Sequence, residues 1–154
     1  MDEDGRQRVE AVYRAQADRM WRALFGFTGD RDVASDALAE AFARALQNEA
    51  VIRDVPGWLW RVSFRLASAE IKRRELPRQG LESPSYELPE PLPELMGALK
   101  HLSPNQRLAL VLHDYADRPS DEVAEAMGCS RATVRVHLSR GRRRLRTLLE
   151  EDHA

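Results

Sequence analysis

The stretch from Arg131 to Leu149 carries seven arginines and no acidic residue. Guanidinium groups bind phosphate oxygens through their charge and can bind a guanine base through two hydrogen bonds. A solvated helix face is the ordinary alternative, but such faces usually mix glutamate with arginine. The composition therefore favours nucleic-acid binding by this stretch.

Residues 120–139, SDEVAEAMGCSRATVRVHLS, have the spacing of a helix-turn-helix. Ala124 is small where two helices would cross closely, and Gly128 suits a tight turn with positive φ. The expected core residues are Val123, Met127, Val134 and Leu138. An ordinary helical hairpin also needs alanine and glycine for packing. The acid-free second helix makes DNA binding the stronger interpretation.

The second helix of such a motif places its N-terminal part in the major groove of DNA. Because Val134 and Leu138 point inward, helical geometry turns Arg135 and Arg143 toward the opposite face. The residues predicted to contact DNA are Arg131, Thr133, Arg135, Val136, Ser139, Arg140 and Arg143. The later arginines of the run, Arg142, Arg143, Arg144 and Arg146, are predicted to contact phosphates.

Catalytic and metal-binding clusters are not indicated. His113 and Asp114 are adjacent, but no second histidine or carboxylate cluster falls at ligand spacing around them, so His113 is interpreted as a packed or capping residue. Cys129 is the one cysteine, and together with four scattered histidines it forms neither a disulfide nor a zinc set. We expect no enzyme activity, no metal and no cofactor.

The bulk composition limits the remaining classes. A chain of 154 residues with 43% hydrophobic residues can form one medium domain or two small ones. It has no run of eighteen apolar residues, and its acidic start, MDEDGRQRVE, does not resemble a signal peptide. These features predict a cytoplasmic protein. The net charge of −1 hides the segregation of basic residues described above.

Five prolines between Leu76 and Pro93 mark a break in the chain. Proline removes an amide donor and fixes φ, so the segment is predicted to be a semi-extended linker over residues 76–93. It would separate a domain at 5–75 from a second domain at 94–150. Apolar residues recur at three- and four-residue spacing in both, which predicts an all-α fold of two small helical domains.

Three helices are predicted in the first domain. The first has Val9, Val12, Tyr13, Ala17, Met20, Trp21, Leu24 and Phe25 on its apolar face. The second, capped by Asp30, has Val33, Ala37, Leu38, Ala41, Phe42, Ala45 and Leu46. The third, with Pro56 in its first turn, has Trp58, Leu59, Val62, Leu66, Ala69 and Ile71. Trp58 is expected in the core, and Trp60 either at a domain edge or stacked on a base.

Four helices are predicted in the second domain. The first covers residues 92–102, and Ser103 with Gln106 has the pattern of a capping box for the next. Ser120 is expected to cap the third helix, and Ser130 the fourth, which would end near Leu149.

The motifs resemble those of the extracytoplasmic-function (ECF) sigma factors of bacterial RNA polymerase. The run LSPNQRLALVLHDYADRPSDEVAEAMGCSRATVRVHLSRGRRRLRTLL is similar to their region 4. The runs LFGFTGDRDVASDALAEAFARAL and PGWLWRVSFRLASAEIKRR are similar to their region 2. The resemblance covers nearly the whole chain except the linker, in the order of the family.

This resemblance implies a promoter-specificity subunit whose partners are core RNA polymerase, promoter DNA and an anti-sigma factor. It implies that Asp36 and Glu40 meet polymerase and that the four-helix domain reads the −35 element. It also implies that the third helix contacts the −10 element, through Trp60, Arg61, Arg65, Lys72 and Arg73.

Three residues depart from the pattern of the family. Ala39 stands where glutamine is usual, Arg65 where asparagine is common, and Ala69 where aspartate is common. In the family these positions serve core binding and separation of the −10 strands. Two alternatives therefore stay open: a stand-alone, dimeric helix-turn-helix regulator, and a sigma-like protein that binds its partners without efficient promoter melting.

Overall fold

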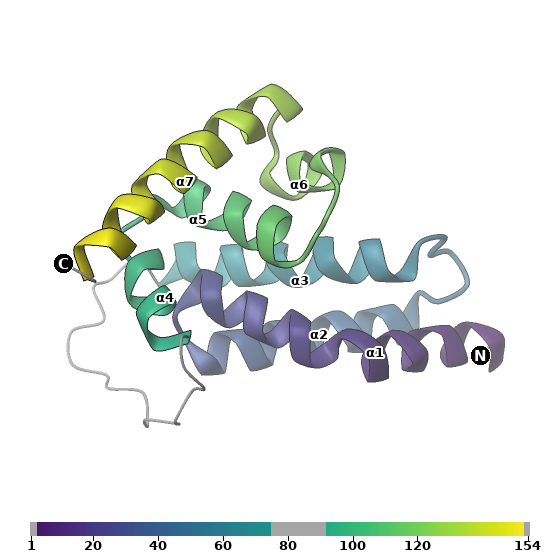
Figure 1. Ribbon diagram of the computed structural model, residues 1–154. Coiled ribbons are helices and arrows are strands. Elements are labelled where there is room, and N and C mark those ends of the chain that lie inside the picture. Colours follow the sequence, from purple (N-terminus) through teal and green to yellow (C-terminus); the bar gives the residue numbers. More distant parts are fainter. Residues whose placement is uncertain (1–2, 75–91, 153–154) are drawn as a thin grey trace. The chain divides into compact units, whose positions relative to one another are not determined.

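The computed structural model of the protein describes residues 3–74 and 92–152 and divides into two compact units, Met1–Pro77 and Arg78–Ala154 (Figure 1). The two units are described separately. The linker predicted at 76–93 lies outside the described residues, except for its last two. Within the described ranges the chain forms helices and turns and no strand, so the all-α prediction is confirmed.

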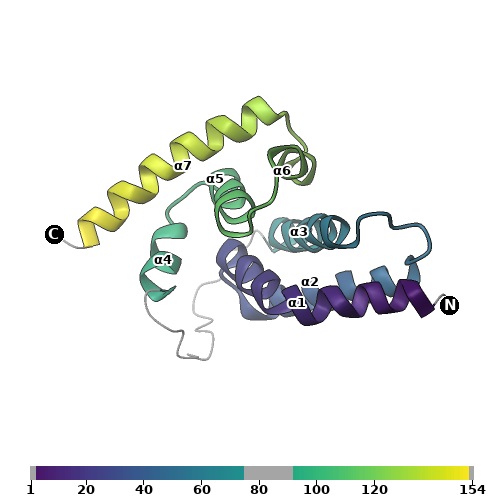
Figure 2. The same cartoon turned by 45° about the vertical axis from the view of Figure 1, so that its right-hand side comes forward.

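The first unit consists of three long helices, α1 (Glu3–Thr28), α2 (Arg31–Gln47) and α3 (Val55–Arg73). Each packs against the other two, as Figure 1 and Figure 2 show. Their shared core includes Met20, Leu24, Val33, Ala41, Leu59, Trp60 and Phe64. Burial of these apolar surfaces is the main force that holds the three helices together.

Short polar side chains start α2 and α3. The predicted cap at Asp30 is confirmed, because its carboxylate accepts a hydrogen bond of 3.0 Å from the amide of Val33. Asp54 caps α3 in the same way and accepts from the amide of Gly57 at 3.2 Å. Both bonds satisfy amides that have no partner inside the first helical turn.

Two predicted core residues of α1 and α2 lie at the surface. Tyr13 is 56% exposed and Leu46 is 37% exposed. Tyr13 packs its edge on the ring of Phe42, at 5.0 Å between centroids. The apolar stripes of α1 and α2 are therefore narrower than their sequence periodicity predicts.

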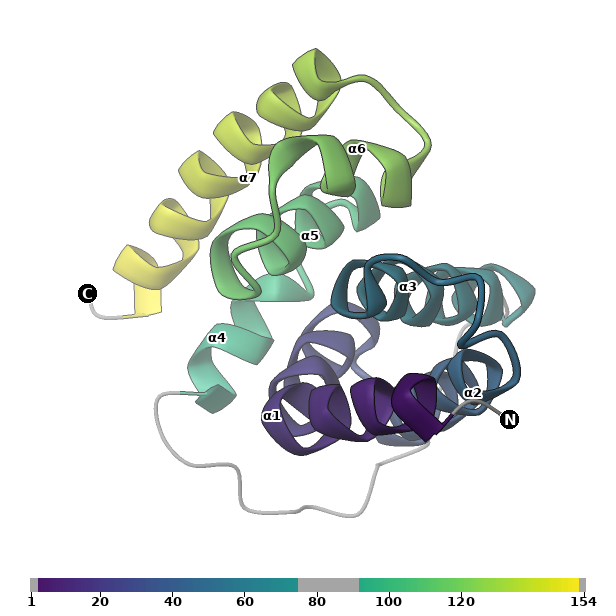
Figure 3. The ribbon, with the colours of Figure 1, turned by 90° about the vertical axis from the view of Figure 1, so that its right-hand side faces the viewer.

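The second unit begins with α4 (Leu92–Leu99) and α5 (Pro104–Leu110), and α5 continues as a π-helical segment, η1 (Val111–Tyr115). The helix α6 (Ser120–Met127), a turn and the long α7 (Arg131–Asp152) follow (Figure 3). The core includes Leu99, Leu102, Leu108, Leu112, Val123, Val134 and Leu138.

The predicted helix starts of this unit are mostly confirmed. Ser103 and Gln106 form the reciprocal capping box. Ser130 caps α7, since its hydroxyl accepts from the amide of Thr133 at 3.1 Å. The prediction for Ser120 was wrong: Ser120 is the first residue of α6, and the cap position holds Pro119, which has no side chain that could accept a hydrogen bond.

Among the helices of residues 3–74 and 92–152, none combines the length and the apolar composition that a membrane-spanning helix needs.

Candidate nucleic-acid interface

The turn between α6 and α7 has the geometry predicted for a helix-turn-helix. Gly128 ends α6 in the left-handed conformation, at φ 69°, which costs glycine no steric strain. Ala124 and Val123 are buried on α6, and Val134 and Leu138 are buried on α7. These small and branched side chains fix the angle at which α7 leaves the turn.

All seven residues predicted to contact DNA lie on the exposed face of α7: Arg131, Thr133, Arg135, Val136, Ser139, Arg140 and Arg143. Val136 is an exposed apolar side chain in the middle of this face, at 44%. The hydroxyl of Thr133 lies 2.9 Å from that of Ser130, so the start of α7 is held by two side-chain contacts. Four of the seven are arginines, so this outward face of α7 carries positive charge.

The arginines of α7 differ in their partners. In the described part of the chain, Arg131, Arg135, Arg140, Arg143, Arg144 and Arg146 make no side-chain ion pair. Arg142 is different, since it binds the carboxylate of Asp114 in η1 through Nε, at 2.8 Å, and through Nη2. The structure thus gives the guanidinium of Arg142 a partner inside the unit, and its contact with phosphate stays a prediction.

Gly141 lies directly beside Arg142 and is buried. A Cβ atom at Gly141 would lie 3.1 Å from Cδ1 of Leu110 and 3.3 Å from Cβ of Gln106. The backbone of α7 thus passes very close to α5 at this point. One signal of this contact is visible in the sequence, because a glycine in the interior of a long helix usually has a packing reason.

The third helix corrects the prediction for its two tryptophans. Trp60 is 1% exposed and lies in the core, where its Nε1 donates to Oε1 of Gln16 at 2.9 Å. Its ring stacks with that of Phe64, at 6.0 Å between centroids. Trp58 is the half-buried one. A base-stacking role for Trp60 was wrong, because the packing of α3 between α1 and α2 turns this ring inward.

The basic residues of α3 lie outside that core. Arg65 and Lys72 are exposed and make no side-chain ion pair in the described ranges. Arg61 is half-buried. Ala69, predicted to face inward, is exposed beside them.

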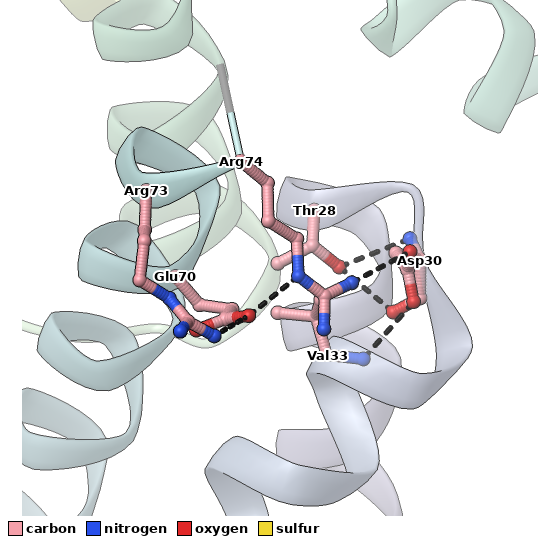
Figure 4. Close-up of polar contacts among 6 residues, drawn as sticks. All are labelled: Thr28, Asp30, Val33, Glu70, Arg73 and Arg74. Atoms are coloured by element: carbon pink, nitrogen blue, oxygen red, sulfur yellow. Dashed lines mark hydrogen bonds and ion pairs between the residues drawn. The ribbon is translucent and has the colours of Figure 1, made fainter. Parts of the chain in front are cut away.

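The end of α3 is a network of ion pairs (Figure 4). Glu70 accepts from Nη2 of Arg73 at 2.7 Å and also from Nε of Arg74. Arg74 reaches in addition to Asp30, at 3.7 Å, and thereby joins α3 to the cap of α2. The hydrogen bonds from Arg73 and Arg74 lower the pKa of Glu70 below its usual range. Arg73 therefore already has a carboxylate partner in the free unit.

A groove between α2 and α3 contains both residues predicted to meet polymerase. It is lined by Val33, Asp36, Ala37 and Glu40 of α2 and by Leu66, Glu70, Arg73 and Arg74 of α3. Glu40 pairs with Arg44 at 2.8 Å, whereas Asp36 makes no ion pair in the described residues. The groove thus combines apolar side chains with acidic residues of α2 and with the charged residues Glu70, Arg73 and Arg74 of α3.

Within the described ranges no group of three or more histidine, cysteine or acidic residues lies together in a way that could hold a metal ion. Cys129 is half-buried in the turn before α7. His113 lies at the surface of the second unit, with its Nδ1 3.0 Å from Asp114.

Comparison with known proteins identifies similar sequences. The family described as "Sigma-70, region 4" matches residues 92–145. The RNA polymerase sigma-E factor of Streptomyces antibioticus is 31% identical over 92% of this chain and 84% of that protein. The ECF RNA polymerase sigma factor SigE of Mycolicibacterium smegmatis is 28% identical over 91% of this chain and 61% of that protein.

The length of the chain differs from that of several relatives. The chain spans 61% of the M. smegmatis protein and 54% of the probable ECF sigma factor SigI of Mycobacterium tuberculosis.

A solved structure has the same fold. It is the sigma factor RpoE of Bartonella quintana, in complex with the anti-sigma factor NepR. The TM-score is 0.80, with 20% identity, over 97% of this chain and 98% of that chain. At this identity the likeness supports the all-α architecture alone.

Proposed function

The chain belongs to the ECF family of sigma-70-type RNA polymerase sigma factors, and from this premise we propose that it is a promoter-specificity subunit. It binds core RNA polymerase in the cytoplasm and directs the start of transcription at promoters with its own −10 and −35 elements. It has no catalytic role of its own in this reaction. Residues 5–75 act as the region 2-like domain and residues 94–150 as the region 4-like domain, joined by the linker at 76–93.

The observation that carries this proposal is the outward face of α7. Six arginines without a side-chain ion pair in the described residues lie on a helix whose inward residues fix it behind a glycine turn. Arg131, Thr133, Arg135, Val136, Ser139 and Arg140 form the part that enters the major groove at the −35 element. Arg143 and the later arginines contact the phosphates beside it.

The first unit binds polymerase through the groove between α2 and α3. Asp36 and Glu40 supply the acidic wall, and Val33, Ala37 and Leu66 supply apolar surface. A basic and apolar helix of the polymerase fits this chemistry. Since Asp36 has no internal partner in the described residues, its charge is available to such a helix.

The −10 element is contacted by the exposed side of α3. Arg61, Arg65 and Lys72 face away from the buried ring of Trp60 and give this side its positive charge. They bind the phosphates of the promoter strands rather than a stacked base. Arg73 joins them where a phosphate competes with Glu70 for its guanidinium.

An anti-sigma factor is the proposed regulator. The structure with the same fold holds such a partner, as its title states. The stand-alone regulator and the sigma-like interaction protein are not favoured, because relatives that align over most of this chain are sigma factors.

Transcription by purified core polymerase tests the proposal directly. Addition of this chain should produce transcripts with defined starts, and alignment of their upstream sequences should give two elements at a constant spacing. Core polymerase that makes no new transcript with the chain, while binding it, would contradict the role as a promoter-specificity subunit.

Asp36→Ala tests the groove. It should weaken capture of core polymerase, because it removes the acidic group without an internal partner. Asp18→Ala, an exposed acid on α1, is the matched control and should leave capture unchanged. Equal capture of both variants would remove Asp36 from the polymerase interface, whatever the outcome of the transcription experiment.

A further inference from the structure

Arg142 occupies a special position in the row of arginines on α7. By sequence it belongs with Arg143 and Arg144, its immediate neighbours. In the structure it is the one arginine of α7 with a side-chain ion pair among the described residues. Its role therefore depends on its partner rather than on the basic composition of the helix.

The partner is the carboxylate of Asp114, which is held from two sides. Nε and Nη2 of Arg142 donate to the two carboxylate oxygens, and Nδ1 of His113 lies 3.0 Å from Oδ1. Hydrogen bonding from Arg142 is the main cause that lowers the pKa of Asp114. A two-pronged arginine–carboxylate pair fixes direction as well as distance, because both groups are planar.

The pair lies near a tight contact between α7 and α5. A Cβ atom at Gly141, the residue before Arg142, would lie 3.1 Å from Cδ1 of Leu110, which is closer than side chains normally pack. Asp114 lies in the π-helical segment η1, where each residue turns through a smaller angle than in an α-helix. Such segments are frequent at functional sites.

The Asp114–Arg142 pair is important for the orientation of α7 because α7 is long. Its first half buries Val134 and Leu138. With 22 residues, α7 extends well beyond these two positions, and it also contacts α4 and α5. Contacts with bases require precise geometry, whereas contacts with phosphates tolerate small rotations of a helix. A helix that rotates would therefore lose its base contacts before its phosphate contacts.

We propose that Arg142 is a positioning residue for DNA recognition: with Asp114 it fixes the orientation of α7, and it does not bind phosphate. This inference rests on the proposed function, because it assigns a role within the DNA-reading helix. It separates Arg142 from Arg143, which the sequence alone would group together.

The test compares Arg142→Ala with Arg143→Ala in the full chain. The probes are a duplex selected by the wild-type chain from a random pool and a shuffled duplex of the same composition, each titrated at several salt concentrations. Arg143→Ala should lower the slope of log affinity against log salt by about 0.9. Arg142→Ala should leave that slope unchanged and reduce the preference for the selected duplex about tenfold.

Two further variants serve as controls for this test. Asp114→Ala should reduce the preference as Arg142→Ala does, and the double variant should be no worse than either single one. Arg142→Lys keeps the charge but loses the two-pronged pair, so it should also lose preference with an unchanged slope. Arg142→Lys replaces Arg142→Ala in the comparison if the alanine variant does not fold. A slope that falls in Arg142→Ala as in Arg143→Ala, or a full preference in Asp114→Ala, would overturn the inference.

Failure of the proposed function gives a different result. A wild-type chain that cannot tell the selected duplex from the shuffled one contradicts DNA reading by α7. The stabilising effect of the Asp114–Arg142 pair is then measured by urea unfolding of the wild type, the two alanine variants and the double variant. Free energies of unfolding that show no coupling between Asp114 and Arg142 would contradict the role of this pair in fixing α7.

Discussion

The two basic helices of this protein, α3 and α7, differ in how their basic side chains are paired with carboxylates. On α3 the last basic residues share a carboxylate, because Glu70 binds both Arg73 and Arg74. On α7 the run from Arg131 to Leu149 contains no acid, and its one paired arginine is bound from another helix. The positive charge of α7 is therefore less neutralised by acids of its own helix than the positive charge at the end of α3.

Packing explains why the two helices differ. α3 lies against both α1 and α2 and buries a broad face, formed by Val55, Gly57, Leu59, Trp60, Ser63, Phe64 and Ala67. α7 buries Val134, Leu138 and Gly141. A helix with few buried positions leaves most of its side chains to solvent or to a ligand, whereas α3 uses its surface mainly to hold the unit together.

The largest expected effect tests this contrast in stability. Trp60→Ala should lower the free energy of unfolding by about 3–5 kcal/mol, because it empties a fully buried site and removes a hydrogen bond to Gln16. Val136→Ala, on the exposed face of α7, should change it by less than about 0.5 kcal/mol. Urea unfolding measures both. Similar losses would mean that α7 is packed as tightly as α3.

The next effect concerns base recognition. Arg135→Ala should weaken binding to a selected duplex by about 1–3 kcal/mol and relax its sequence preference, if its guanidinium contacts a base. Arg22→Ala, an exposed arginine of α1, is the matched control and should leave this preference unchanged. Fluorescence anisotropy titrations of selected and shuffled duplexes give the comparison. An unchanged preference in Arg135→Ala removes it from the reading surface.

A smaller effect separates free from neutralised arginines. Arg144→Ala should lower the salt slope for duplex binding by about 0.9, as the loss of one phosphate contact requires. Arg73→Ala should change the slope less, because Glu70 already neutralises that guanidinium. In a Glu70→Gln background, Arg73→Ala should lower the slope more than it does in the wild type. Equal slopes in both backgrounds would show that Glu70 does not mask Arg73.

The smallest effect is the dependence of the Asp114–Arg142 pair on pH. The pKa of Asp114 is lowered in the folded protein, so its contribution is present above the ordinary value of 3.8 and is lost as the pH falls through the lower folded value. The pair is partly exposed, so solvent screening limits its contribution to less than about 1 kcal/mol. Asp114→Asn should therefore be slightly less stable than the wild type near neutral pH, by thermal unfolding.

The matching experiment at acid pH completes that test. Below the folded pKa, Asp114 is protonated and resembles asparagine in charge, so the two proteins should unfold at the same temperature. A difference that persists or grows in acid would mean that the carboxylate charge does not stabilise the fold.

Local rules determined much of this protein. Helical periodicity predicted the helices, and short-range chemistry predicted the caps at Asp30, Ser103 and Ser130, because each cap involves residues three positions apart. Gly128 was predicted as the turn for the same reason, since the preference of glycine for positive φ needs no distant partner. The exposed face of α7 followed from the inward register of Val134 and Leu138.

Tertiary packing decided which of the two tryptophans is buried and which distant charges are paired. Trp60 rather than Trp58 lies in the core because α3 is covered on two sides, which helical spacing by itself does not reveal. Asp114, the partner of Arg142, lies 28 residues away along the chain, and Asp30, the second partner of Arg74, lies 44 residues away. A side chain's preference for water or for a helix is local, whereas its neighbour is set by the packing of helices that are distant in sequence.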